Sequence, residues 1–407
     1  MSSSDYPLRQ SGIYHNLPTF DPTIKNLSAI VCGANGISGF NTVRALLDSP
    51  DRWATIYTLS RHPLSEKQLS LIPSALHGRI KHVPVDLSDS PEKVAGDLVG
   101  AGVHADYVFY YTYAQPSSDG ETFLKALEIA DIEPKRILLQ TGGKNYGMHI
   151  GRVRTPLVES DPQPRHLSKN FYYAQEDDLK AFCSRHSTGW NVVRPAGVIG
   201  ASPNSPLNIF WPFAIYAAIQ ARKGEPLEFG GTFESWQFEA GHSTARLSGY
   251  LSEWDGGLLS WNRFFSELAR WFGVYKGVVP PKVDDKFTIA ISLAGGEQAP
   301  LGYGPPLNLD LKFSLAEWFK GPTNKSAWEE IMADSDVTAN PFADGTAAQM
   351  MGDFAYLRFG TLSMNKARIY GFSGFVDSCE SIFESFVDME RLGLLPPMKV
   401  SAARALV

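Results

Sequence analysis

A phenol and an ammonium group in the middle of the chain are the residue types best suited to chemistry. Lys144 lies in QTGGKNYG (140–147), and Tyr172 lies in NFYYAQEDDL (170–179). A phenol can donate a proton or a hydrogen bond to a substrate oxygen. A nearby ammonium makes that phenol more acidic through its charge. Spacing alone equally allows a core tyrosine and a surface lysine.

The spacing around Tyr172 departs from a common pattern. Short-chain dehydrogenases usually place the two groups on one helix as Tyr-x-x-x-Lys, whereas here Glu176 stands four residues after Tyr172 and Asp177 four after Tyr173. A lysine partner must therefore come from elsewhere, and Lys144 is the candidate.

Buried strands and helices alternate around these residues and must position them. The segment before Lys144 reads as the end of a strand, and Asn170 is expected to cap a helix. This alternation predicts an α/β fold, a Rossmann-type doubly wound parallel sheet with a mainly helical C-terminal substrate-binding cap. Strands are expected at 29–32, 54–60, 80–86, 106–113, 136–142 and 190–197, and helices at 120–130, 170–185, 207–223 and 261–274.

The chain divides into three parts by composition. We expect an irregular N-terminal arm at 1–27, a nucleotide-binding domain at 28–204, and a mainly helical region at 205–400 with segments that return to the core. Pro-Pro pairs and glycines make 280–313 loop-like. Aromatic residues of the C-terminal region are expected mostly in the core.

The segment AIVCGANGISGF (29–40) predicts a dinucleotide site, because a strand, a glycine turn and a helix follow one another. Gly33 permits the tight turn, Gly36 lets the backbone approach a pyrophosphate, and Gly39 allows close helix–strand packing. Three glycines alone would be weak evidence, and the flanking elements strengthen the prediction.

The end of the second strand, Ser60-Arg61-His62, has no acidic residue of the kind that binds the ribose of NAD. A guanidinium matches phosphate oxygens, so Arg61 favours the 2′-phosphate of NADPH, the alternative being a surface arginine. Asp86 and Leu87 end the third strand, where they would flank an adenine or simply form a turn.

The overall composition excludes several classes of protein. The 407 residues are 43% hydrophobic and 20% charged, with a net charge of −6 and no basic tract, so no nucleic acid or membrane partner is expected. No signal peptide is expected, because the first residues contain no apolar stretch, and the three cysteines show no disulfide or metal spacing. A cytoplasmic location and no bound metal are expected.

Several motifs together resemble the progesterone 5β-reductase/iridoid synthase family of atypical extended short-chain dehydrogenases. They are TGGKNY, NFYYAQED, RPAGVIGASPNSPLN, VFYYTYA and SMNKARIYGFSGF, and the similarity covers about 27–400. The resemblance implies that Lys144 and Tyr172 are catalytic. It also implies NADPH-dependent reduction of activated C=C bonds in enones and enals, here of a bulky apolar small molecule.

The residues expected to bind the cofactor lie in the glycine turn and at the strand ends. They are Gly33, Asn35, Gly36, Ile37, Gly39, Ser60, Arg61, His62, Asp86, Leu87, Thr112, Tyr113, Ala114, Gln140, Pro195 and Val198. Tyr113 is also the one aromatic residue expected at the substrate pocket.

Three features depart from the family pattern. His62 stands where family members commonly have an arginine after the second strand. This replacement would weaken binding of the 2′-phosphate of NADPH. Residues 242–264 lack a strand that relatives add to the sheet. The edge of the sheet that this strand would cover must be covered in another way, and formation of a homodimer is one such way. Residues 285–313 are longer than in plant relatives and are expected near the substrate mouth.

Other functions remain open at this point. An isomerase or cyclase would use the same fold and the same pair without net reduction, and a ketoreductase would use the same tyrosine. A non-catalytic NmrA-like dinucleotide sensor is disfavoured, because a sensor needs no proton donor at Lys144 and Tyr172.

Overall fold

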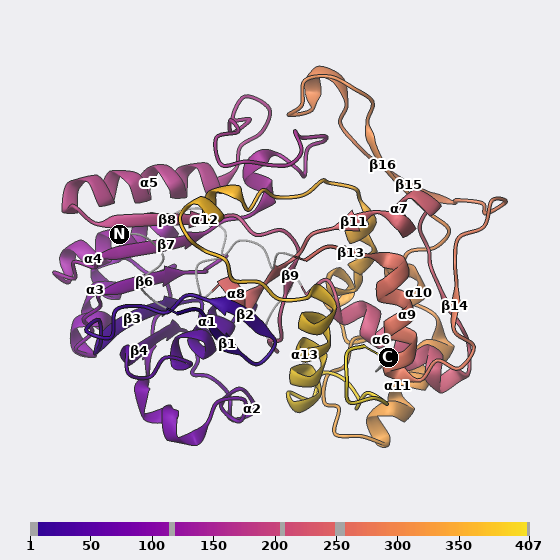
Figure 1. Ribbon diagram of the computed structural model, residues 1–407, viewed down its shortest axis with the longest axis horizontal. Coiled ribbons are helices and arrows are strands. Elements are labelled where there is room, and N and C mark those ends of the chain that lie inside the picture. The colour runs from indigo at the N-terminus through magenta and orange to yellow at the C-terminus, as the bar shows by residue number, and fades with distance from the viewer. Residues whose placement is uncertain (1–6, 114–118, 204–207, 249–256, 405–407) are drawn as a thin grey trace.

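A computed structural model describes residues 7–113, 119–203, 208–248 and 257–404. A six-stranded parallel sheet with the order β5-β4-β3-β6-β7-β8 forms its N-terminal part (Figure 1). The order reverses between β3 and β6, which is the position of the ligand crevice in a Rossmann-type fold. The strands are β3 (Leu27–Cys32), β4 (Trp53–Ser60), β5 (Ile80–Pro84), β6 (Tyr107–Tyr110), β7 (Arg136–Gln140) and β8 (Gly189–Val193).

Helices cover both faces of this sheet, as the predicted fold class requires. Alternate residues of β3 point to opposite faces, so Ile30 and Cys32 pack against α3 (Pro91–Gly100), α4 (Asp119–Ile129) and α5 (Phe171–His186). Ala29 and Val31 pack on the other face against α1 (Ile37–Leu47). The prediction of an α/β Rossmann-type sheet is confirmed.

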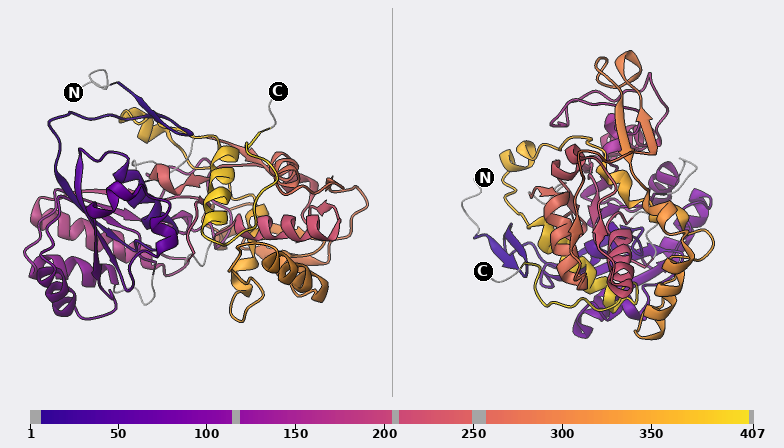
Figure 2. Two further views of the ribbon diagram at one scale, coloured as in Figure 1. Left: turned by 90° about the horizontal axis from the view of Figure 1, so that it is seen from below. Right: turned by 90° about the vertical axis from the view of Figure 1, so that its right-hand side faces the viewer.

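The C-terminal region lies beside the sheet domain and is mainly helical (Figure 2). Its main helices are α6 (Trp211–Lys223), α9 (Trp261–Phe272), α11 (Pro322–Ala333) and α13 (Ser378–Arg391). They enclose an aromatic core in which Phe213, Trp271 and Trp328 are fully buried. The expectation that most aromatic residues here are core residues is confirmed.

Segments of this region return to the sheet domain. Helix α8 (Ala245–Ser248) packs on α1, and Arg246 binds Asp48 at 2.9 Å. Asp388 of α13 forms an ion pair with Arg44 of α1. The two parts of the molecule are therefore joined by buried contacts on the α1 side of the sheet.

Two predictions of irregular structure were wrong. The arm contains a hairpin of β1 (Arg9–Ser11) and β2 (Tyr14–Leu17), because Tyr14 and Leu17 find apolar neighbours in the C-terminal region. Residues 280–313 contain the antiparallel hairpin β15 (Ile289–Leu293) and β16 (Leu307–Leu311). In β16 every second residue is buried, an alternation that the neighbouring prolines and glycines obscured.

Short elements complete the fold. They are α2 (Glu66–Leu69), α7 (Phe233–Gln237), α10 (Leu315–Trp318), α12 (Asn365–Ile369), β9 (Val198–Ile199), β10 (Leu227–Glu228), β11 (Glu239–Ala240), β12 (Ser243–Thr244), β13 (Leu259–Ser260) and β14 (Val278–Val279). Within 242–264, β12 pairs with β9 and β13 with β11, and 249–256 lie outside the described residues.

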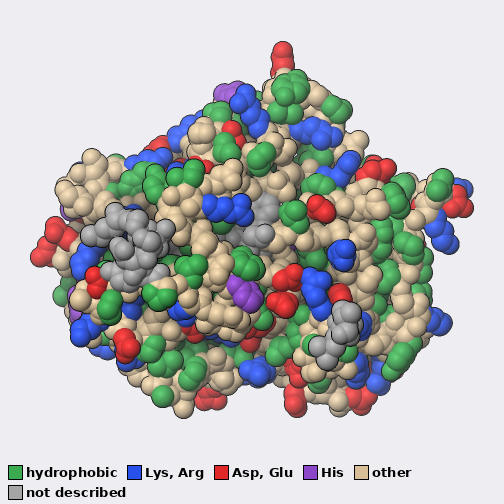
Figure 3. Space-filling view, viewed as in Figure 1, with side chains coloured by type: hydrophobic (Ala, Val, Ile, Leu, Met, Phe, Trp, Pro, Cys, Tyr) green, Lys and Arg blue, Asp and Glu red, His purple; other side chains and the backbone are tan. Residues whose placement is uncertain are grey.

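The surface shows no broad patch of one charge on the face in Figure 3, where acidic and basic side chains are interspersed. Among the described residues, no helix combines the length and the apolar character needed to cross a bilayer.

Candidate active site

The glycine turn after β3 has the geometry expected of a dinucleotide-binding loop. Gly33 adopts a φ of +72°, which a side chain would strain. A Cβ on Gly36 would meet only the Gly33 carbonyl oxygen at 3.3 Å, so the space in front of this residue is open. Gly36 also begins α1 without a side-chain cap, and the free N–H groups of that helix end suit a phosphate.

Gly39 has the close backbone contact that only glycine allows. A Cβ there would lie 2.2 Å from the Gly33 carbonyl oxygen and 2.9 Å from Ala34 Cα. We expect Gly39→Ala to displace the turn, to weaken dinucleotide binding at least about tenfold, and to lower the free energy of unfolding by about 1–3 kcal/mol. Titration with NADP+ and urea denaturation measure both effects.

The matched control is Gly96→Ala in α3, because nothing lies within 4 Å of a Cβ at Gly96. Alanine suits a helix better than glycine, so this variant should keep its nucleotide affinity and its stability. Equal behaviour of the two variants would contradict the role given to Gly39.

Buried polar atoms without partners gather at this edge of the sheet. Asn35 Oδ1, Thr112 Oγ1 and Gln140 Oε1 have no hydrogen-bond partner among the described residues. The sequence predicted all three as cofactor-binding residues. Buried polar atoms are normally satisfied, so these atoms fit a polar ligand in the crevice.

The end of β4 is tied to the glycine turn. Asn35 Nδ2 donates to the His62 carbonyl oxygen at 2.6 Å and to Ser60 Oγ at 3.3 Å. The side chains of Arg61 and His62 are exposed, so both are free to meet a phosphate. The sequence predicts that the glycine turn and the end of the second strand lie side by side, and the contacts of Asn35 agree with this prediction.

Asp86 lies near Arg61 at the end of the third sheet strand. Hydrogen bonds from Ser88 lower the pKa of Asp86, and the Arg61 guanidinium lowers it further. Leu87, in contrast, has its side chain in the core beneath α3, so only its backbone faces the crevice edge.

Three further predicted cofactor residues lie beside or at the start of α1 or in β9. Gln140 donates to Ser38 Oγ of α1 at 2.9 Å. Ile37 lies against the backbone at Gly200, and Val198 pairs with β12. Ala114 lies outside the described residues.

Lys144 and Tyr172 are held together through the start of α5. Lys144 belongs to a 3-10 turn, Gly143–Tyr146, that follows β7. Asn170 caps α5 by accepting from the Tyr172 N–H at 3.1 Å, and its Nδ2 donates to the Lys144 carbonyl oxygen at 2.8 Å. One asparagine thus joins the backbone of both predicted catalytic residues.

Tyr172 lies almost buried between the ends of β7 and β8. Tyr172 is 6% exposed. A Cβ added to Gly142 would lie 3.4 Å from its hydroxyl oxygen, so the hydroxyl lies close to the Gly142 backbone. Burial raises the pKa of Tyr172, as does the neighbouring Tyr113. Its hydroxyl has no protein hydrogen-bond partner in the described part of the chain, so it is a protonated donor without an acceptor.

Lys144 contacts a different phenol. Its Nζ donates to Tyr113 Oη at 3.1 Å, and no hydrogen bond joins it to Tyr172. The Tyr113 ring contacts Tyr172 edge-on, with centroids 6.3 Å apart. The structure therefore brings both predicted catalytic residues into one cluster but places Tyr113 between them, a contact that sequence reasoning missed.

A buried ion pair connects the helix that carries Tyr172 to the turn that carries Lys144. Arg194 Nη2 lies 2.9 Å from both carboxylate oxygens of Glu176, whose side chain is 1% exposed. With its amide oriented accordingly, Asn145 accepts from Arg194 at 3.0 Å and donates to Glu176 at 3.2 Å. Glu176 stands one helical turn after Tyr172, so the network fixes α5 to the turn that holds Lys144.

His149 follows the same turn and was not predicted as a site residue. Burial lowers the pKa of His149, and the charge of Lys144 lowers it further. The histidine is therefore neutral near pH 7 and adds no second charge beside Lys144.

The hairpin β15–β16 lies against the segment after Lys144, near the expected substrate mouth. The Ala294 N–H donates to the Ile150 carbonyl oxygen at 2.8 Å, and the Leu301 N–H donates to the Arg152 carbonyl oxygen at 2.9 Å. These two bonds hold residues 294–301 against the segment that follows Lys144.

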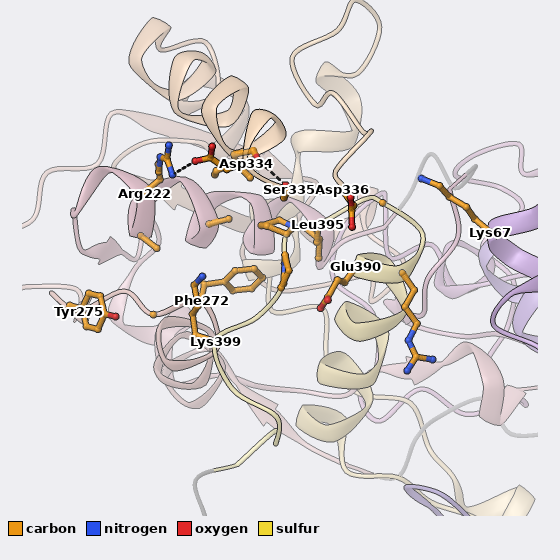
Figure 4. A pocket seen from close by; sticks show the side chains of 18 residues that line it. Lys67, Arg222, Phe272, Tyr275, Asp334, Ser335, Asp336, Glu390, Leu395 and Lys399 are labelled. Carbon is orange, nitrogen blue, oxygen red and sulfur yellow. Dashed lines mark hydrogen bonds and ion pairs between the residues drawn. The ribbon is translucent and has the colours of Figure 1, made fainter.

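A separate pocket of about 730 Å³ lies between α6, α11 and the C-terminal segment, lined by Phe272 and Lys399 among others (Figure 4). None of the predicted site residues lines it. Arg222 at its rim is already paired with Glu330 and Asp334, both at 2.8 Å. This pocket is therefore separate from the residues that the sequence predicts for the cofactor and the substrate.

The chain is similar to known proteins over part or most of its length. Residues 110–252 match the model of the PRISE-like Rossmann-fold domain. The chain is 27% identical to the short chain dehydrogenase gsfE of Penicillium aethiopicum, over 91% of this chain and 99% of that protein.

Plant relatives are similar over nearly the same length. A 3-oxo-Delta(4,5)-steroid 5-beta-reductase of Arabidopsis thaliana is 25% identical, and an (S)-8-oxocitronellyl enol synthase of Nepeta racemosa is 27% identical, each over 88% of this chain and 90% of the relative. Among solved structures, Thermus thermophilus UDP-glucose 4-epimerase with NAD shares 14% identity and a TM-score of 0.44 over 81% of this chain and 99% of that one. The resemblance inferred from the sequence motifs is confirmed by the relatives.

Proposed function

We propose that this chain, a short-chain dehydrogenase-like oxidoreductase related to progesterone 5β-reductase and iridoid synthase, reduces activated C=C bonds with NADPH. The substrate is a bulky, apolar enone or enal of specialised metabolism. The observation that best supports this proposal is the cluster of Lys144, Tyr113 and Tyr172 at the strand ends that the glycine turn also borders.

The chain's residues have distinct roles in this reaction. When bound, NADPH would supply a hydride for the β-carbon of the enone, and the carbonyl oxygen would then take up negative charge. Tyr172 donates a hydrogen bond to that oxygen, and the positive charge of Lys144 stabilises it. The raised pKa of Tyr172 keeps the phenol protonated, so it acts as a donor and not as a base. Solvent then protonates the α-carbon.

The residues also fit the dinucleotide itself. The N-terminus of α1 would hold the pyrophosphate, and Arg61 would hold the 2′-phosphate. The three cysteines in the chain are buried and free, which suits the reducing cytoplasm where we place the protein.

Arg61 gives a direct test of the cofactor. Because a hydrogen bond to a charged group contributes roughly 1.5–3 kcal/mol, Arg61→Ala should weaken NADPH binding at least about tenfold and leave NADH binding unchanged. His62→Ala should have a smaller effect. Fluorescence titration of both dinucleotides provides the measurement, and an equal loss for NADPH and NADH would contradict the assignment.

The function is tested by a small panel of substrates. NADPH absorbance is followed with cyclohexenone, progesterone and a linear enal, and cyclohexanone serves as the saturated control. We expect oxidation of one NADPH per saturated product for an enone and none for cyclohexanone. Product formation without NADPH oxidation would instead establish a cyclase or isomerase, and turnover of cyclohexanone a ketoreductase.

A further inference from the structure

We infer that Tyr113 is a second hydrogen-bond donor to the substrate oxygen, oriented by Lys144. This inference deepens the proposed function and rests on it. It assigns to Tyr113 a role beyond the cofactor contact expected from the sequence.

The hydrogen bond to Lys144 determines where the Tyr113 proton can go. An ammonium group has donors only, so in the 3.1 Å contact the phenol oxygen must accept and Lys144 must donate. The single proton of Tyr113 then points away from Lys144. No protein acceptor for it exists among the described residues, whereas a ligand oxygen in the crevice would provide one.

The phenol is also positioned from a second side. Its ring meets Phe171 edge-on at 5.3 Å and Tyr172 edge-on at 6.3 Å, and both rings begin α5. The ring contacts and the bond to Lys144 together hold Tyr113 in one orientation. Its side chain is 47% exposed, so its hydroxyl is open to a ligand.

The two phenols therefore have complementary positions. Tyr172 is nearly buried, and Tyr113 lies beside it, about half exposed, with the Lys144 ammonium bonded to its oxygen. Two donors converging on one oxygen are the usual way to stabilise a developing oxyanion. The charge of Lys144 accordingly reaches the substrate through Tyr113.

A stable enolate tests this arrangement by binding alone. The anion of dimedone, a cyclic 1,3-dione, mimics the enolate, and 3,3-dimethylcyclohexanone is its neutral counterpart. With the NADP+-loaded protein, we expect Tyr113→Phe and Lys144→Met each to weaken dimedone binding at least about tenfold. The double variant should be little worse than either single variant, because the two groups act as a unit.

Matched controls separate this role from a structural one. Tyr173→Phe alters the neighbouring phenol, which faces Arg165, and should bind dimedone like the wild type. Affinity for the neutral ketone should change less than affinity for the enolate. With an enone substrate, Tyr113→Phe should lower kcat more than it alters KM.

The outcomes distinguish the inference from the proposed function. Unchanged enolate affinity in Tyr113→Phe, purely additive losses in the double variant, or no enolate binding by the wild type would each overturn the inference. If enones are not reduced but Tyr113→Phe still loses enolate binding, the reductase proposal fails and the role of Tyr113 as an oxyanion donor stands.

Discussion

Replacing Tyr172 by phenylalanine should lower kcat/KM for an enone by about 10²–10³-fold and leave NADP+ affinity unchanged. Loss of one donor to a developing oxyanion typically has this size. The substitution removes only a hydroxyl that has no protein partner in the described part of the chain, so the fold should be unaffected. Steady-state kinetics with NADPH and a titration of NADP+ provide the two measurements.

Tyr173→Phe is the natural control for this prediction, since it removes a hydroxyl from the next residue of the same helix. Its rate should remain near that of the wild type. Wild-type turnover in Tyr172→Phe would exclude this phenol from the mechanism, and loss of NADP+ binding would show a structural role instead.

Arg194→Met should lower the free energy of unfolding by about 3–5 kcal/mol, because it leaves the Glu176 carboxylate buried without its ion-pair partner. The same variant should lose reductase activity, since Glu176 and Asn145 fix the turn that holds Lys144. Urea denaturation and enone kinetics measure the two effects.

A surface ion pair made by the residue that follows Glu176 in α5 is the matched control. Arg165 and Asp177 are 2.8 Å apart but about half exposed, so Asp177→Asn should change stability by less than about 1 kcal/mol. A double replacement of Arg194 and Glu176 by Met and Leu should recover much of the lost stability but not the activity. Recovery of activity as well would show that the pair does not position Lys144.

The sheet could be predicted from the sequence because its strands are continuous apolar runs. The run at 54–60 became β4 (Trp53–Ser60), and the glycine turn had the backbone geometry expected of it. The hairpin β15–β16 was missed because it packs against the C-terminal region, and its alternation is flanked by prolines and glycines. Strands that are stabilised mainly by contacts with residues far away in the sequence show only a weak strand pattern in their own residues.

The candidate site was predictable in part. The order of the elements places Lys144 and Tyr172 near the same strand ends, and the motifs identified both. The Tyr113–Lys144 bond depends on side-chain orientation, which no spacing reveals. The position of Glu176, one turn after Tyr172 on a partly buried helix face, could have indicated a buried carboxylate. Its ion-pair partner Arg194 follows a different strand, so the pairing itself could not be predicted from spacing.

Transfer of deuterium tests the central claim most directly. The protein is given an enone together with NADPH that carries deuterium at C4 of the nicotinamide, on one face and then on the other. NMR and mass spectrometry then locate the deuterium in the product. We predict one deuterium at the β-carbon of the saturated product, from one face only. Deuterium at the carbonyl carbon, or a product that carries none from either face, would contradict the account.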